Sequence, residues 1–195
     1  MFIHTTKFDK LDKNITYCGY SISDGLIGKR IQEHAVNFMK RNKRGIILRK
    51  EDIAVHSFVL HYEDGHWYVY ESRFKGGVQK NIAERSLSEL DRNFLYACNN
   101  KFFKEYANSL IEEGVGYSVR GIARHWLDKT VSFFTEDYKN INFIFGKPDG
   151  MFCTEFMDII TNQILARHFG VHPHTLIPAH QQIYAIEKNI KLIEL

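Results

Sequence analysis

The feature that most constrains the fold is a pair of β-rich runs on either side of a tight-turn signal. Residues 53–62 and 66–72 are rich in β-branched and aromatic side chains and flank Glu63-Asp64-Gly65. Asp-Gly between such runs is typical of a two-residue hairpin turn, because both turn positions require a positive φ. The sequence therefore predicts an antiparallel β-hairpin.

A two-residue turn also determines which residues face each other. If Asp64-Gly65 forms the turn, Phe58 opposes Glu71 and His56 opposes Arg73. His56 and Glu71 are then diagonal neighbours on one face, about 7–8 Å apart at the backbone. At that spacing a carboxylate can hydrogen-bond an imidazole and select its tautomer. The hairpin thus predicts a base and its orienting group.

This inference depends on the turn type. A three-residue turn would shift the parity of the strand and place His56 and Glu71 on opposite faces. His61, on the other face of the same strand, would then compete with His56 as the base.

The rest of the sequence predicts helices and short strands around the hairpin, which indicates an α+β fold. The expected elements are strands at 15–22 and 46–48, helices at 25–39, 86–113 (with a break allowed at 99–100), 117–129 and 153–169, a loop at 170–180, and a closing strand or hairpin at 183–195. Residues 133–145 fit no single pattern. We find no internal repeat and no linker, so a single domain spanning 1–195 is expected.

Composition narrows the class of protein. With 44% hydrophobic and 25% charged residues, the 195-residue chain can bury one core. The formal charge of +3 is too small to predict a nucleic-acid partner, although Lys40 to Arg44 form a local basic cluster. No run approaches the roughly 20 apolar residues of a membrane span, and Met1–Lys10 has no signal-like apolar stretch. We expect a cytoplasmic protein with no integral membrane segment.

The cysteines and histidines do not form a recognisable metal site. Three cysteines, an odd number, match no zinc spacing, so free thiols in a reducing compartment are expected: Cys18, Cys98 and Cys153. Four histidines gather near the C-terminal loop without cysteine or carboxylate ligands at suitable spacing: His168, His172, His174 and His180. Neither a metal nor another cofactor is predicted.

Cys153 is the candidate nucleophile. A Gly/Pro/Asp turn at 146–150 precedes it, and the amphipathic pattern that follows places it at the start of a helix. Helix N-terminal N–H groups stabilise a thiolate and can also hold an oxyanion. Glu155, in the first turn, is expected to point away from the sulfur, as a helix-stabilising or substrate-contacting group. Taken one at a time these residue types are common, and a cysteine at a helix start is more often part of the core.

Several short motifs together resemble one family. They are residues 24–31, 55–59, 69–72, 76–78, 116–117 (expected to open a helix), 152–156 and 173–178. Their order is similar to the circularly permuted branch of the NlpC-type papain-like hydrolases, the YiiX-like group, distantly related to lecithin retinol acyltransferase. The agreement covers roughly residues 20–185 and is weakest at 40–49.

The resemblance implies a permuted papain-like fold, in which an antiparallel sheet carries the His/Glu hairpin and packs against helices that include the nucleophile helix. It implies Cys153 as nucleophile, His56 as general base and acid, and Glu71 as the group that orients His56. Tyr117 could face the cleft and, with Glu155, contact substrate.

Three functions remain open at this point. The first is hydrolysis of an amide bond in a peptide, with cell-wall-type peptides the best-known substrates of the wider family. The second is a lipid-directed thiol esterase or acyltransferase on the same site, with an apolar groove at Phe133, Phe134 and Phe152. The third is a non-catalytic binding module, or a phage or virus accessory protein, of the same fold.

Overall fold

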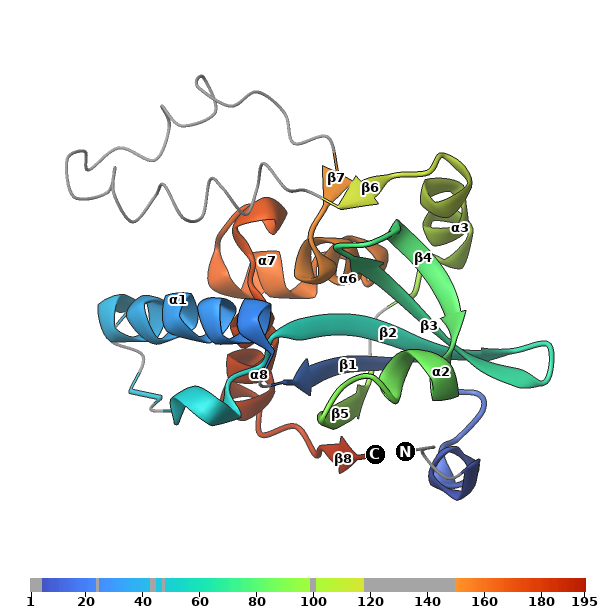
Figure 1. The fold of residues 1–195 in the computed structure, drawn as a ribbon, viewed down its shortest axis with the longest axis horizontal. Coiled ribbons are helices and arrows are strands. Elements are labelled where there is room, and N and C mark those ends of the chain that lie inside the picture. Colours follow the sequence, from blue (N-terminus) through green and yellow to red (C-terminus); the bar gives the residue numbers. More distant parts are fainter. Residues whose placement is uncertain (1–4, 24, 43–44, 47, 99–100, 118–149) are drawn as a thin grey trace.

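The computed structural model describes residues 5–23, 25–42, 45–46, 48–98, 101–117 and 150–195 (Figure 1). Several sequence predictions lie outside these residues. They are the helix beyond Tyr117, the segment 133–145 with Phe133 and Phe134, the break at 99–100, and the basic side chains of 40–44.

A six-stranded antiparallel sheet forms the centre of the molecule, in the order β4-β3-β2-β1-β5-β8. Its strands are β1 (Tyr17–Ile22), β2 (His56–Glu63), β3 (His66–Arg73), β4 (Gly77–Ile82), β5 (Arg92–Ala97) and β8 (Ile193–Glu194). A separate parallel pair consists of β6 (Gly116–Tyr117) and β7 (Gly150–Met151). The predicted α+β class is confirmed.

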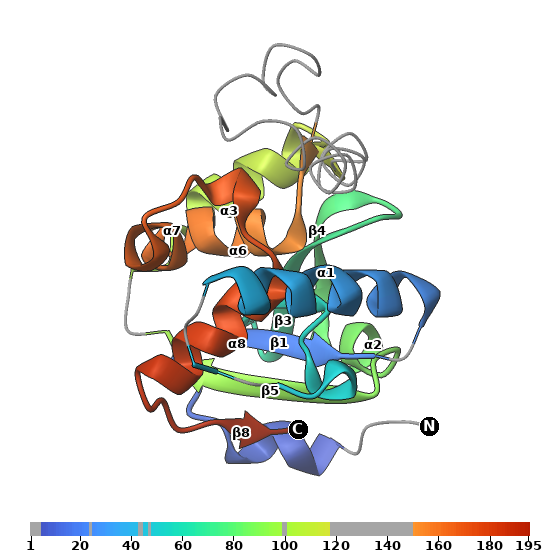
Figure 2. The ribbon, with the colours of Figure 1, turned by 90° about the vertical axis from the view of Figure 1, so that its left-hand side faces the viewer.

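Helices cover both faces of this sheet (Figures 1 and 2). They are α1 (Leu26–Asn42), α2 (Ala83–Leu87), α3 (Lys104–Glu112), α6 (Cys153–Ile160), α7 (Ile164–Phe169) and α8 (Pro178–Glu187), with 3-10 turns at Thr5–Lys10, Lys50–Asp52 and Pro173–Thr175. Strand side chains alternate between two cores: Val59 and Tyr70 pack with α3, α6, α7 and α8, whereas Phe58, Leu60 and Val69 pack with α2 and the first 3-10 turn.

The predicted hairpin and its register are confirmed. Glu63 pairs with His66 across Asp64-Gly65, and Phe58 pairs with Glu71. Asp64 and Gly65 have φ values of 49° and 83°, the positive values that a two-residue turn of this type requires.

The long helix predicted at 86–113 is wrong, because its middle is strand β5. Arg92–Ala97 pairs along its whole length with β1, and the sheet contacts override the weak helical periodicity. Among the described residues of this range, helical structure is found in α2 before this strand and in α3 after it.

The prediction for the C-terminal residues is also wrong, because it expected no helix where the structure has one. Residues expected as a loop and a closing strand form α8, which starts at Pro178 with proline in its first turn and buries Ala179 and Ile183. Only Ile193–Glu194 is a strand, beside β5.

Two smaller corrections concern element boundaries. Ile46 and Leu48 lie in no strand, and Leu48 packs against the α1 core instead. Gly116–Tyr117 forms β6 rather than opening a helix.

The helix predicted at 153–169 is divided into α6 and α7. The division falls at Asn162 and Gln163, whose φ values are 65° and 53°. The Asp158 carboxylate caps the new helix by accepting the N–H groups of Leu165 at 2.7 Å and Ala166 at 3.3 Å.

Among the described helices, none combines the length and apolar character needed to cross a bilayer.

Two glycines allow β4, β6 and β7 to approach closely. A Cβ on Gly77 would lie 2.3 Å from the Val115 carbonyl oxygen, and a Cβ on Gly150 would lie 2.2 Å from that of Gly116. Side chains at these positions are therefore excluded by neighbouring backbone. This junction leads directly into the start of α6.

We predict that Gly150→Ala lowers the free energy of unfolding by about 1–3 kcal/mol, because the backbone of β6 must move to admit a methyl group. Urea denaturation measures this change. Gly25→Ala is the matched control, since its Cβ would meet nothing nearer than Ser23 Oγ at 3.8 Å, and it should be neutral or slightly stabilising. Equal stability of the two variants would contradict the prediction.

Candidate functional site

The site lies where strands β2 and β3 separate. The β1–β2 ladder extends to Ser21↔His56, but the described β2–β3 ladder ends at Phe58↔Glu71. Beyond that pair, β3 continues to pair with β4 as far as Arg73↔Gly77. His56 and Ser57 are therefore held by a strand on one side, and the other side is open to a different partner.

The start of α6 occupies this position. The Ser57 backbone N–H donates a hydrogen bond to the Cys153 sulfur, and the Ser57 hydroxyl lies 3.1 Å from that of Thr154. From β3, the Ser72 hydroxyl donates to the Met151 carbonyl oxygen at 2.7 Å. Both separated strands thus anchor the chain that carries the thiol.

Glu71 holds His56 from the other side. His56 Nε2 lies 2.7 Å from Glu71 Oε2, and Glu71 is 0% exposed. The same oxygen accepts Arg73 Nε at 2.8 Å, and Oε1 accepts Ser86 Oγ at 2.5 Å and Asn81 Nδ2 at 3.3 Å. Burial alone would raise the pKa of Glu71, but the hydrogen bond and charge of His56, with Arg73 and Ser86, lower it to about 2.

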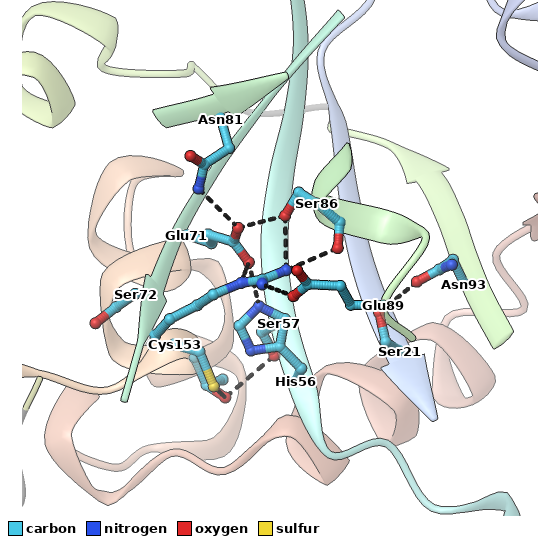
Figure 3. A network of polar contacts seen from close by, with 12 residues as sticks. Ser21, His56, Ser57, Glu71, Ser72, Asn81, Ser86, Glu89, Asn93 and Cys153 are labelled. Carbon is cyan, nitrogen blue, oxygen red and sulfur yellow. Dashed lines mark hydrogen bonds and ion pairs between the residues drawn. The ribbon is translucent and has the colours of Figure 1, made fainter. Parts of the chain in front are cut away.

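The second ring nitrogen of His56 faces Cys153 (Figure 3). Because Nε2 is bonded to Glu71, Nδ1 is the ring nitrogen that faces the sulfur. Burial lowers the pKa of His56, but the hydrogen bonds and charges of Cys153 and Glu71 raise it to about 9.

The contact with His56 also shifts the pKa of the Cys153 thiol, in the opposite direction. Burial raises the pKa of Cys153, but the hydrogen bond and charge of His56, with the Ser57 N–H, lower it below its ordinary value. A raised imidazole pKa beside a lowered thiol pKa favours an imidazolium–thiolate pair at neutral pH.

The helix start supplies donors next to the sulfur. Cys153 is the first residue of α6, and the helical bonding begins with Phe156 N–H to the Phe152 carbonyl at 2.8 Å. The N–H groups of Cys153 and Thr154 accordingly have no intrahelical acceptor. They could donate to an oxyanion that forms at a carbon bonded to the sulfur.

Glu155 closes the first turn of this helix. Its Oε2 accepts the Phe152 N–H at 3.3 Å, and the residue is 5% exposed. This is the helix-stabilising arrangement expected from the sequence. Glu155 also lines a surface cavity of about 490 Å³, which includes Arg167 and His172. A contact between Glu155 and substrate stays a prediction.

Tyr117 lies beside the nucleophile from β6. Its ring packs edge-on against Phe152, with centroids 5.8 Å apart. The Phe74 ring packs against the same tyrosine, with centroids 6.1 Å apart, so the three rings form a row. Burial and the charge of Cys153 raise the pKa of Tyr117. The residue is therefore placed near the thiol, and its role in substrate binding stays a prediction.

The competing base is directed away from the site. His61 Nδ1 lies 2.9 Å from Thr16 Oγ1, and its ring packs against Phe102. The two-residue turn accounts for this placement, because residues 56 and 61 differ in parity along the strand.

Sequence reasoning missed most of the polar residues around the three candidates. The position of Arg73 near the site could have been predicted, because Arg73 shares a strand face with Glu71 and was expected opposite His56. The positions of Ser57 and Ser86 could not, since their roles depend on where α6 and α2 dock. Among the described residues, no three histidine, cysteine or acidic side chains come together as a metal site.

Comparisons with known proteins add no identification. A scan against protein-family models and a search of curated proteins both found no match to this chain.

Glu71 should make stability depend on acid pH. Its pKa of about 2 in the folded protein lies below the ordinary value of 4.5, so its contribution is complete above pH 4.5 and is lost as pH falls toward 2. We predict a loss of roughly 3 kcal/mol over this range, measured by urea unfolding at several pH values. In Glu71→Gln this component should disappear, and the variant should be less stable at pH 7.

Glu113→Gln, which removes an exposed carboxyl, is the control and should retain the acid-dependent loss. If Glu71→Gln kept both the wild-type stability at pH 7 and the wild-type acid dependence, the buried-anion account would be wrong.

Proposed function

We propose that this protein is a cysteine hydrolase with a circularly permuted papain-like fold, which cleaves an amide bond in a peptide. Cys153 is the nucleophile, His56 the general base and acid, and Glu71 the group that orients His56. The observation that carries the proposal is the His56 ring, which is hydrogen-bonded on one side to the buried Glu71 and faces Cys153, at the start of α6, with the other.

The arrangement of elements supports the fold assignment. The strand with the histidine precedes the helix with the cysteine, and that helix packs on the antiparallel sheet. This is the order implied by the resemblance to the permuted NlpC-type hydrolases.

In the first half of the reaction the Cys153 thiolate attacks the substrate carbonyl carbon. A sulfur–carbon bond forms, and the carbonyl electrons move to oxygen, where N–H groups at the start of α6 stabilise the negative charge. The intermediate collapses with cleavage of the carbon–nitrogen bond. The imidazolium Nδ1–H of His56 gives its proton to the leaving amine, and an acyl-enzyme remains.

The second half releases the acid. His56, now neutral, takes a proton from water while the water oxygen attacks the thioester carbon. The carbon–sulfur bond then breaks and restores the thiolate and the imidazolium. Throughout, the ionised Glu71 holds Nε2–H so that Nδ1 stays directed at the reacting atoms.

A second candidate is a lipid-directed esterase or acyltransferase on the same site. The row formed by Phe74, Tyr117 and Phe152 favours it, because Phe74 is 54% exposed and the row extends to the residue before Cys153. An acyl chain could pack along such a surface. Peptide amides and acyl esters, tested against the native protein and Cys153→Ser, distinguish the two candidates.

The first test is the rate of Cys153 alkylation by iodoacetamide as a function of pH, with mass spectrometry to locate the label. We expect Cys153 to react well below the pKa of roughly 8.5 of a free thiol. In His56→Ala the rate at pH 6 should fall by about tenfold or more. His61→Ala is the matched control and should behave as the native protein.

Free cysteine, alkylated under the same conditions, provides the ordinary thiol for comparison. If Cys153 titrates like an ordinary thiol and is unaffected by His56→Ala, the hydrolase proposal is wrong. The protein would then be a binding module of the same fold.

A further inference from the structure

Arg73 connects the interior of the site to the protein surface. Its Nε donates to Glu71 Oε2 at 2.8 Å, and its Nη1 donates to Glu89 Oε2 at 2.5 Å. Its Nη2 donates to the carbonyl oxygen of Ser86 at 2.8 Å and to the Ser86 hydroxyl at 2.7 Å. The guanidinium is therefore held by β3, by α2 and by the turn that follows α2.

The result is a line of five charges with alternating sign. Glu89, Arg73, Glu71, His56 and Cys153 follow one another, each in contact with the next. The outer end is solvated, since the Glu89 side chain is 62% exposed, whereas Arg73 is 23% exposed and Glu71 is 0% exposed. Solvent thus reaches the line chiefly at Glu89.

We propose that Arg73 is a positioning residue that sets the pH range of the Cys153–His56 pair, and that Glu89 moderates its effect from the surface. The inference rests on the proposed function, because it concerns the same thiol and imidazole. The inference goes beyond the proposed function because it assigns roles to Arg73 and Glu89, which lie outside the proposed catalytic set of three residues.

The geometry gives Arg73 two effects. Arg73 and His56 both donate to Glu71 Oε2, at 2.8 Å and 2.7 Å, so the guanidinium fixes the oxygen that fixes the ring. Its positive charge also lies close to the imidazole, because both groups donate to the same Glu71 oxygen. It therefore disfavours protonated His56 and favours ionised Cys153, and it lowers the pKa of both groups.

Glu89 has the opposite sign. Its carboxylate offsets part of the Arg73 charge, so its removal leaves Arg73 more effective. The other groups facing these two residues are Glu71 from β3, His56 from β2 and the neutral hydroxyl of Ser86 from α2. Tyr117 faces Cys153 from β6 with its pKa raised, so it stays neutral in the relevant range.

Removal of the positive charge of Arg73 and removal of the negative charge of Glu89 should therefore shift the pKa values of Cys153 and His56 in opposite directions. In Arg73→Gln both the lower pH limit, where the thiolate forms, and the upper limit, where His56 loses its proton, should rise by on the order of one pH unit. In Glu89→Gln both limits should fall by a few tenths of a unit, because solvent screens an exposed charge. Arg73→Lys retains the charge and should leave both limits near their native positions.

The ultraviolet absorbance of the Cys153 thiolate against pH, taken as the difference from Cys153→Ser in each background so that Cys18 and Cys98 cancel, gives the lower limit. The NMR chemical shift of the His56 imidazole against pH gives the upper limit. Arg85→Gln removes the same charge from an exposed position in α2 and is the control. It should shift neither limit. Glu89→Gln and Arg85→Gln alter exposed side chains, so the test stands even where Arg73→Gln fails to fold.

Three results would overturn the inference. They are shifts of the same sign in Arg73→Gln and Glu89→Gln, a Glu89→Gln profile identical to that of Arg85→Gln, or equal loss of thiolate in Arg73→Lys and Arg73→Gln without movement of either limit. The last would indicate a merely structural role. A native protein with no thiolate at neutral pH would instead overturn the proposed function itself, and this inference with it.

Discussion

The site depends on a negative charge that has no contact with solvent. A buried carboxylate is strongly destabilising unless it is paired and hydrogen-bonded. Glu71 meets this requirement with donors from four elements: His56 in β2, Arg73 in β3, Asn81 in β4 and Ser86 in α2. Because only the assembled sheet and α2 bring these donors together, the carboxylate couples the position of the imidazole to the fold as a whole.

A second constraint is the separation of β2 from β3. An uninterrupted ladder would pair Ser57 with the neighbouring strand and leave no room for the start of α6. With the described ladder ending at Phe58↔Glu71, the Ser57 N–H is available to the Cys153 sulfur. The close approach of β6 and β7 at Gly116 and Gly150 delivers the chain to this point. Local departures from regular β-structure therefore build the site, as is common where a sheet carries function.

Local chemistry explains what could be predicted from the sequence. Asp64-Gly65 determines a turn type, the turn determines the register, and the register brings His56 and Glu71 to one face. These steps need only residues close along the chain. The strand inside the predicted helix at 86–113 depends instead on β1, at least seventy residues away, and the contacts of Arg73 with Ser86 and Glu89 depend on where α2 docks. Contacts with such distant partners leave no pattern in the neighbouring sequence from which they could be predicted.

The buried charges of this site are an unfavourable way to stabilise a fold. Burial raises the pKa of Cys153 and lowers that of His56, so each effect by itself would leave both groups neutral. The charged pair is favoured only because each charge has an opposite charge beside it, from the sulfur to Glu71 and on to Arg73. Apolar residues of similar volume commonly stabilise a core as well as such a network or better. A thiol with a lowered pKa at a helix start, beside an imidazole with a raised one, is the arrangement that the proposed reaction at the sulfur requires.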